Sequence, residues 1–216
     1  MAEIKICGLT RAEDAAVAAA LGAAYAGVIF AGGPRRRTVA QAAEVFAGLR
    51  GSAVRRVGVF GVASAADIAE TAAILALDVV QLHAGGDRDA VRNLRERYAG
   101  AVWGVIGVDA DGAWGDLPWP IDALDAVVLD TSVAGRQGGT GVAFDWVAAR
   151  PQVAARLTGR RWVLAGGLRP STVGTAVRTL SPSVVDVSSG VESAPGIKDE
   201  ELLRAFVQAT PRDGAA

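Results

Sequence analysis

Two residues that can exchange protons with a bound molecule stand at the ends of short apolar runs in this sequence. Cys7 ends the run Glu3–Cys7, and Asp130 ends the run Ala126–Asp130. A thiolate can take a proton from carbon and a carboxylic acid can give one to oxygen, so the pair predicts acid–base chemistry without a cofactor. The alternative for each is structural, because a lone cysteine is commonly a small buried hydrophobe and an aspartate after a strand can cap a loop.

Lys5 lies two residues before Cys7, which places both side chains on the same face of a strand. A lysine buried there needs an acidic partner, and Asp186 is the candidate. The alternative is that Lys5 is itself a nucleophile that forms a Schiff base.

Two glycine-containing segments near the end of the chain, Leu164–Leu168 and Ser188–Gly190, predict an anion site. Glycine lets backbone N–H groups approach a phosphate closely. The residues expected to bind the phosphate are Gly166, Gly167, Ser189 and Gly190. Other polar candidates that follow apolar runs are Arg35, Gln81, His83, Asp109 and Asp186.

Eight strand-like runs and seven helix candidates must position these side chains. The runs are Glu3–Cys7, Tyr25–Phe30, Val54–Phe60, Asp78–Leu82, Ala101–Gly107, Ala126–Asp130, Arg161–Ala165 and Val184–Val187. The helix candidates are Ala12–Leu21, Val39–Leu49, Ala65–Leu75, Asp87–Tyr98, Phe144–Ala149, Ser171–Leu180 and Glu200–Gln208. Thr10, Thr38 and Ser64 are the expected N-caps of the first three helices, and the prolines and glycines of Asp109–Leu124 favour a loop.

This alternation predicts an α/β protein, a compact (β/α)8 TIM barrel that forms a single domain over residues 1–210 with a frayed tail at 211–216. The segment Ala134–Gly141 is glycine-rich and expected to be mobile. A doubly wound open sheet is the alternative, but it favours a G-x-G-x-x-G loop that the first strand end lacks. In a barrel, Cys7 and Asp130 would face each other across the mouth, with phosphate bound after strands seven and eight.

Composition narrows the class of protein. Of 216 residues, 51% are hydrophobic and 21% charged, and the net charge of −1 does not favour nucleic-acid binding. One cysteine and one histidine cannot form a disulfide or a Cys/His metal site, so no metal is expected. Because neither a membrane span nor a signal peptide is visible, we expect a cytoplasmic protein that binds a small molecule and does not bind membranes.

The chain resembles the phosphoribosylanthranilate isomerases of tryptophan biosynthesis along nearly its whole length. The resemblance is carried by segments that occur in the family's order. They are Lys5–Thr10, Val57–Phe60, Gln81–His83, Gly138–Gly141, Phe144–Trp146, Leu164–Leu168, Val185–Glu192 and Pro195–Asp199.

This resemblance implies an Amadori rearrangement of a phosphoribosyl substrate without metal or organic cofactor. Asp130 would protonate the furanose oxygen as general acid, and a Cys7 thiolate would remove the C2 proton as general base. That role asks the surroundings of Cys7 to favour its ionised form. Arg35 would bind the anthranilate carboxylate. Because Gly32-Gly33-Pro34 replaces the family's usual serine-containing turn, Arg36 is the fallback, and a solvated patch of Arg35–Arg37 is the alternative.

Three other functions fit the sequence less well. The related histidine-pathway isomerase resembles a barrel with an aspartate where this chain has Cys7. Indole-glycerol phosphate synthase would need interior lysines, and the only lysines are Lys5 and Lys198. A non-catalytic phosphosugar-binding barrel would keep the glycines without needing both Cys7 and Asp130. Either a monomer or a homodimer is compatible with the sequence.

Overall fold

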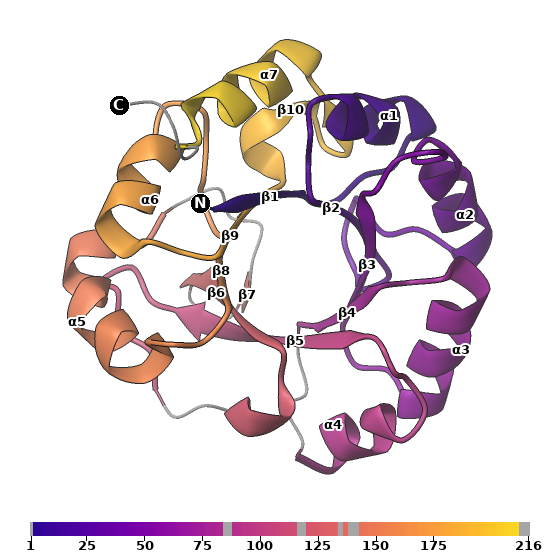
Figure 1. Ribbon diagram of the computed structural model, residues 1–216, viewed down its shortest axis with the longest axis horizontal. Helices are drawn as coiled ribbons and strands as arrows, with labels where there is room; N and C mark the ends of the chain where they lie inside the picture. Colours follow the sequence, from indigo (N-terminus) through magenta and orange to yellow (C-terminus); the bar gives the residue numbers. More distant parts are fainter. Residues whose placement is uncertain (1, 84–87, 116–119, 134–135, 138–142, 212–216) are drawn as a thin grey trace.

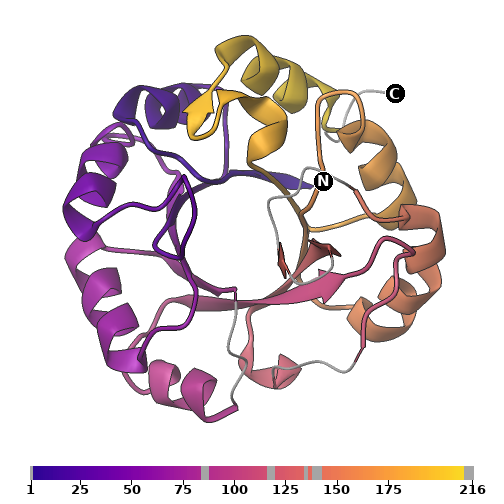
Figure 2. The same ribbon diagram turned by 180° about the vertical axis from the view of Figure 1, so that it is seen from behind.

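The structure is a computed structural model, and it describes residues 2–83, 88–115, 120–133, 136–137 and 143–211. Within this part of the chain, eight parallel strands form a closed ring, seen end-on in Figure 1 and from behind in Figure 2. Each strand pairs with the next, and the last pairs with β1. They are β1 (Glu3–Ile6), β2 (Tyr25–Ile29), β3 (Arg55–Phe60), β4 (Val79–Leu82), β5 (Ala101–Val108), β6 (Ala126–Val133), β8 (Trp162–Leu164) and β9 (Val184–Val187). The ring confirms the predicted barrel and excludes the open sheet.

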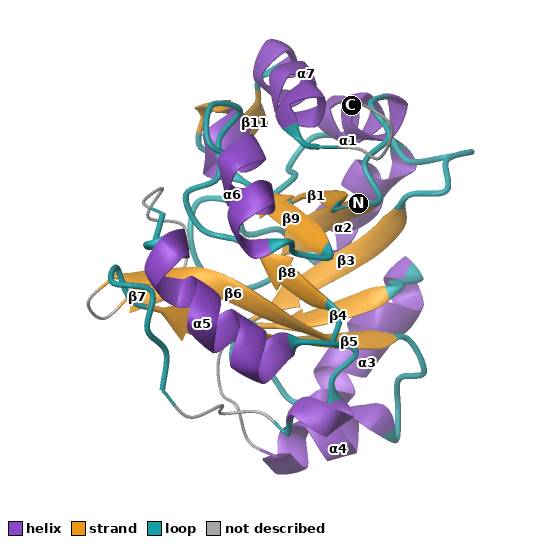
Figure 3. Ribbon diagram, turned by 60° about the vertical axis from the view of Figure 1, so that its left-hand side comes forward, coloured by secondary structure: helices purple, strands orange, loops and turns teal. Residues whose placement is uncertain are grey.

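Helices cover the outside of the ring, as the side view in Figure 3 shows. They are α1 (Ala12–Ala20), α2 (Val39–Ala47), α3 (Ala65–Leu75), α4 (Arg88–Arg95), α5 (Trp146–Leu157), α6 (Val173–Leu180) and α7 (Glu200–Ala209). Two 3-10 turns, η1 (Ile121–Ala123) and η2 (Ser189–Val191), lie in the connections. A short strand, β7 (Arg136–Gln137), pairs antiparallel with the end of β6, and β10 (Glu192–Ala194) forms a hairpin with β11 (Ile197–Lys198). The described part of Asp109–Leu124 contains η1 and no α-helix, in line with the predicted loop.

Strand alternation divides the buried residues into two layers. On β1, Ile4 and Ile6 point outward and pack under the helices, whereas Lys5 and Cys7 point into the barrel. The interior is filled mainly by valines, and Trp103 packs edge-on against Tyr25 with ring centroids 4.9 Å apart. The interior is therefore packed with side chains.

Two of the three N-cap residues predicted from the sequence cap their helices in the structure. Thr38 caps α2 with a full capping box to Gln41, and Ser64 caps α3 through the N–H of Asp67. Thr10 is not the cap of α1, so that prediction is wrong. Its hydroxyl donates to the carbonyl of Gly196, because the chain returns past this position 186 residues later.

The fifth helix differs from its predicted extent of Phe144–Ala149. It begins at Trp146 and continues through Pro151 to Leu157. A proline normally favours a helix end, but Val153 and Leu157 are buried in the core, and this burial favours the longer helix. None of the helices in the described residues has the length and apolar character needed to cross a bilayer.

Some predictions fall on residues that the structure does not describe. These are the tail at 212–216, the motif Gly138–Gly141, and the segment Ala134–Gly141 apart from Arg136 and Gln137 of β7.

Candidate active site

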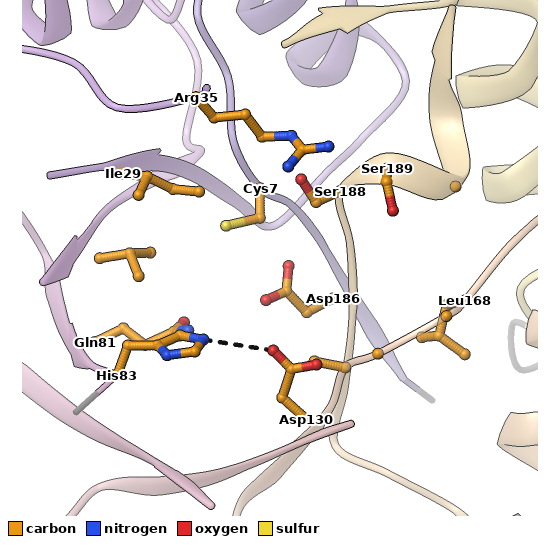
Figure 4. Close-up of a pocket in the computed structure, with 15 residues that line it drawn as sticks. Cys7, Ile29, Arg35, Gln81, His83, Asp130, Leu168, Asp186, Ser188 and Ser189 are labelled. Atoms are coloured by element: carbon orange, nitrogen blue, oxygen red, sulfur yellow. Dashed lines mark ion pairs between the residues drawn. The ribbon is translucent and has the colours of Figure 1, made fainter. Parts of the chain in front are cut away.

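One cavity at the carboxyl ends of the strands brings together all but one of the residues chosen for the site from the sequence. Figure 4 shows this cavity. It is lined by Cys7, Ile29, Arg35, Val59, Gln81, His83, Asp130, Ala165, Gly166, Gly167, Leu168, Asp186, Ser188, Ser189 and Gly190. Asp109, the remaining candidate, is exposed and its carboxylate accepts the N–H of Ala113, so it stabilises its own loop instead.

Cys7 enters the cavity from the end of β1, where it is 7% exposed. Burial raises the pKa of its thiol above the ordinary value, and the nearby Lys5 ammonium opposes this rise without cancelling it. The expectation that the surroundings favour the ionised thiol is therefore wrong, because desolvation outweighs the cation.

Asp130 faces the cavity from the opposite side, on β6 (Figure 4). One of its carboxylate oxygens lies 3.5 Å from Nε2 of His83, the residue that follows β4. The neighbouring strand end comes unusually close at Gly166, where an added Cβ would lie 2.2 Å from Oγ1 of Thr131 and 2.9 Å from Oδ1 of Asp130. Glycine is required there both by this approach and by its φ of 84°.

Lys5 and Asp186 form a buried ion pair below Cys7. Nζ of Lys5 lies 2.6 Å from Oδ2 of Asp186, and the register of β1 and β9 places the two residues side by side. Burial by itself lowers the pKa of Lys5, but Asp186 and Cys7 together outweigh burial and raise that pKa above its ordinary value. The partner predicted for Lys5 is confirmed. Among the described residues, Oδ1 of Asp186 has no hydrogen-bond partner, which leaves it free to accept from a ligand.

Arg35 lines the cavity, and a carboxylate already holds one edge of its guanidinium. Nε and Nη2 donate to the two oxygens of Glu192 at 2.8 and 2.6 Å. Lys198 also donates to Glu192, at 2.9 Å, and to the carbonyl of Ser188. By contrast, Arg36 is exposed, and Nη1 of Arg37 donates to the carbonyl of Arg36.

Sequence reasoning did not select Glu192 or Lys198 for the site. One signal could have found Lys198, because the chain has two lysines among 22 basic residues and both are buried in this wall of the barrel. The other 20 basic residues are arginines, so a lysine in this sequence indicates a buried position. Glu192 then follows as the carboxylate that a buried lysine needs.

The glycine-rich end of the cavity joins the loops after β8 and β9. Gly166 and Gly167 both have positive φ, 84° and 64°. An added Cβ at Gly190 would lie 1.9 Å from the carbonyl oxygen of Leu168, so these two loops are in direct contact. The Ser188 hydroxyl is buried without a partner in the described part of the chain. Backbone N–H groups and an unpartnered hydroxyl suit a phosphate group.

The arrangement as a whole offers a thiol and a carboxyl group on opposite sides of one cavity, with a guanidinium and a glycine-rich anion site at its rim. Within the described residues, no three His, Cys, Asp or Glu side chains gather so that they could hold a metal ion.

Comparison with known proteins agrees with this geometry. The sequence model of the family described as N-(5'phosphoribosyl)anthranilate (PRA) isomerase matches residues 4–209. The N-(5'-phosphoribosyl)anthranilate isomerase of Rubrobacter xylanophilus is 40% identical over 211 residues, which cover 97% of this chain and 98% of the relative.

Solved structures show the same fold at full length. The phosphoribosyl anthranilate isomerase of Thermus thermophilus superposes with a TM-score of 0.80 at 33% identity, covering 96% of this chain and 97% of that one. A phosphoribosyl anthranilate isomerase in complex with reduced 1-(o-carboxyphenylamino)-1-deoxyribulose 5-phosphate has a TM-score of 0.77 at 30% identity, covering 97% and 98%. Fold, cavity and full-length similarity agree, and the chain belongs to the N-(5'-phosphoribosyl)anthranilate isomerase family.

Proposed function

We propose that Cys7 is the general base and Asp130 the general acid in the isomerisation of N-(5'-phosphoribosyl)anthranilate, the tryptophan-pathway reaction of this family. One observation carries the assignment. The two side chains enter the same cavity from strands three apart in the ring, so a sugar bound between them meets a proton donor on one side and a proton acceptor on the other.

The reaction needs four proton transfers on the sugar. Asp130 gives a proton to the furanose oxygen, the bond from C1 to that oxygen breaks, and the anthranilate nitrogen becomes a protonated Schiff base. The Cys7 thiolate then takes the proton from C2, and the electrons form an enolamine. Protonation at C1 and loss of the proton from the C2 hydroxyl give the aminoketose. Atoms and charge balance, because the product is an isomer of the substrate.

Arg35 binds the carboxylate of the anthranilate ring in this proposal. Glu192 accepts from Nε and Nη2, which leaves the Nη1 edge of the guanidinium for a second carboxylate. The phosphate lies against Gly166, Gly167, Ser189 and Gly190 in the loops after β8 and β9. Gln81, His83 and Asp186 also line the cavity, where they would contact the sugar hydroxyls.

Two substitutions test the acid and the base. Cys7→Ala and Asp130→Asn should each lower kcat about 10²–10⁴-fold, followed as loss of anthranilate fluorescence on freshly generated substrate. Asp109→Asn is the matched control, because Asp109 also follows a strand but lies outside the cavity. Turnover close to wild type in either cavity variant would remove that residue from its role.

The same measurements distinguish a non-catalytic phosphosugar-binding barrel, which would bind a product analogue and show no turnover. The cytoplasmic location, and the choice between monomer and homodimer, stay predictions.

A further inference from the structure

Lys5 is fully buried in the barrel interior, and the proposed acid–base steps do not use it. A buried ammonium is costly, and replacing a buried ion pair by apolar side chains is often neutral or stabilising. The Lys5–Asp186 pair therefore needs a reason other than stability, and its position directly under Cys7 suggests one.

Lys5 and Cys7 share one small space inside the barrel. Both point inward from β1, and the facing residue on β2 is Gly27. A Cβ added at Gly27 would lie 3.0 Å from Sγ of Cys7 and 3.3 Å from Cε of Lys5. Because Gly27 has no side chain, Cε of Lys5 and Sγ of Cys7 can both occupy the space in front of it.

We propose that Lys5 is a positioning residue for Cys7: its ammonium, held by Asp186, stabilises the negative charge that the sulfur carries when it acts as base. The proposal rests on the general-base role of Cys7 proposed above. It assigns Lys5 an electrostatic part in the reaction and no covalent one, because the ammonium is already bound to a carboxylate at 2.6 Å.

Four charged groups act on the sulfur, and their signs show why Lys5 matters. Lys5 on the same strand and Lys198 on β11 favour the thiolate, and Asp186 on β9 opposes it. Arg35, after β2, also interacts favourably with a charged Cys7. Arg35 and Lys198 both donate hydrogen bonds to Glu192. Asp186 accepts a hydrogen bond from Lys5 instead. Among these groups Lys5 has the largest effect favouring the thiolate.

Two substitutions should therefore shift the pKa of the Cys7 thiol in opposite directions. Lys5→Met removes the cation and keeps the length of the side chain, so the thiol should ionise at higher pH. Asp186→Asn removes the opposing anion and leaves the lysine in place, so the thiol should ionise at lower pH. An opposite charge within about 4–6 Å shifts the pKa of a group by about 1–3 units.

The experiment measures the rate of iodoacetamide alkylation between pH 6 and 11. Cys7 is the one cysteine of the chain and lines the cavity, so the rate reports its thiolate alone. We expect the midpoint of the profile to rise by about 1 pH unit or more in Lys5→Met and to fall by about 1 pH unit in Asp186→Asn. At neutral pH each unit corresponds to about a tenfold change in alkylation rate.

Two further variants keep the test decisive. Val128→Ala opens the same barrel interior without changing any charge, and should leave the midpoint in place. The double variant Lys5→Met/Asp186→Asn removes both charges and avoids a lone buried carboxylate, so it covers the case in which Lys5→Met does not fold. Its midpoint should lie between those of wild type and Lys5→Met.

An unchanged midpoint in Lys5→Met, or shifts of the same sign in Lys5→Met and Asp186→Asn, would overturn the proposal. If Lys5→Met fails to fold, a double-variant midpoint at or below the wild-type value overturns it. Alkylation needs no turnover, so a failure here is separate from a failure of Cys7 as the base, which Cys7→Ala reports.

Discussion

Removal of the Glu192 side chain tests how Arg35, the arginine proposed to bind the substrate carboxylate, is held. The Glu192 side chain is 5% exposed and accepts hydrogen bonds from Arg35 and Lys198, so Glu192→Ala leaves two cations without their shared carboxylate. Lys198 is the more sensitive of the two, because its side chain is fully buried and keeps only the carbonyl of Ser188.

The expected loss of stability follows from that burial. Taking one partner from a buried ion pair costs about 3–5 kcal/mol. The lower end applies here because Arg35 reaches the open cavity and can regain water. At about 2–4 °C of Tm per kcal/mol for a chain of this size, Tm should fall by roughly 6–12 °C. Because Arg35 also loses its fixed orientation, KM should rise about tenfold, equivalent to ~1.4 kcal/mol, with a smaller change in kcat.

The pH dependence of stability tests the same contacts of Glu192 independently. Burial raises the pKa of Glu192, but Arg35 and Lys198 together outweigh burial and hold that pKa below its ordinary value. A carboxyl group whose pKa is lowered by folding stabilises the protein above its unfolded pKa, about 4.3 for glutamate, and this stabilisation is lost as the pH falls through the folded pKa. The Tm difference between wild type and Glu192→Ala should therefore shrink below about pH 4.

Thermal unfolding followed by circular dichroism between pH 3 and 8 measures both effects. Glu192→Gln keeps the shape and one acceptor and should lose less stability, and Glu44→Ala, at an exposed position, should change Tm very little. A Tm for Glu192→Ala within a degree of wild type, or a difference independent of pH, would refute this reasoning.

Three further substitutions have defined outcomes. Gly166→Ala should lower kcat at least tenfold, because the new Cβ would lie 2.2 Å from Oγ1 of Thr131 and 2.9 Å from Oδ1 of Asp130, the proposed acid; unchanged kinetics would contradict this. Arg35→Ala should raise KM well above the effect of Arg37→Ala, and equal small effects would support a solvated patch. Trp103→Ala should cost about 3–5 kcal/mol in a denaturant titration, because the ring is 1% exposed inside the barrel; a loss under 1 kcal/mol would show that the interior refills.

The sequence by itself determined the barrel and placed Cys7 and Asp130 at one cavity. Most strands are short apolar runs followed by glycine or a polar residue, and this local pattern needs no knowledge of the partner strand. Cys7 and Asp130 could be paired in advance because parallel strands in a barrel send their carboxyl ends to one mouth. The glycines at 166 and 190 carried a similar local signal, since a close approach of neighbouring atoms excludes a side chain there.

The contacts that connect distant parts of the chain were decided only by the tertiary structure. Glu192 meets Arg35 across 157 residues because the β10–β11 hairpin turns back toward the loop after β2. Thr10 fits the sequence pattern of a helix cap, but its hydroxyl goes to a chain segment that returns beside it. The ionisation of Cys7 was misjudged for the same reason. A sequence shows that a lysine is two residues away, but the balance between that cation, Asp186 and the loss of water depends on how deeply the closed barrel buries all three.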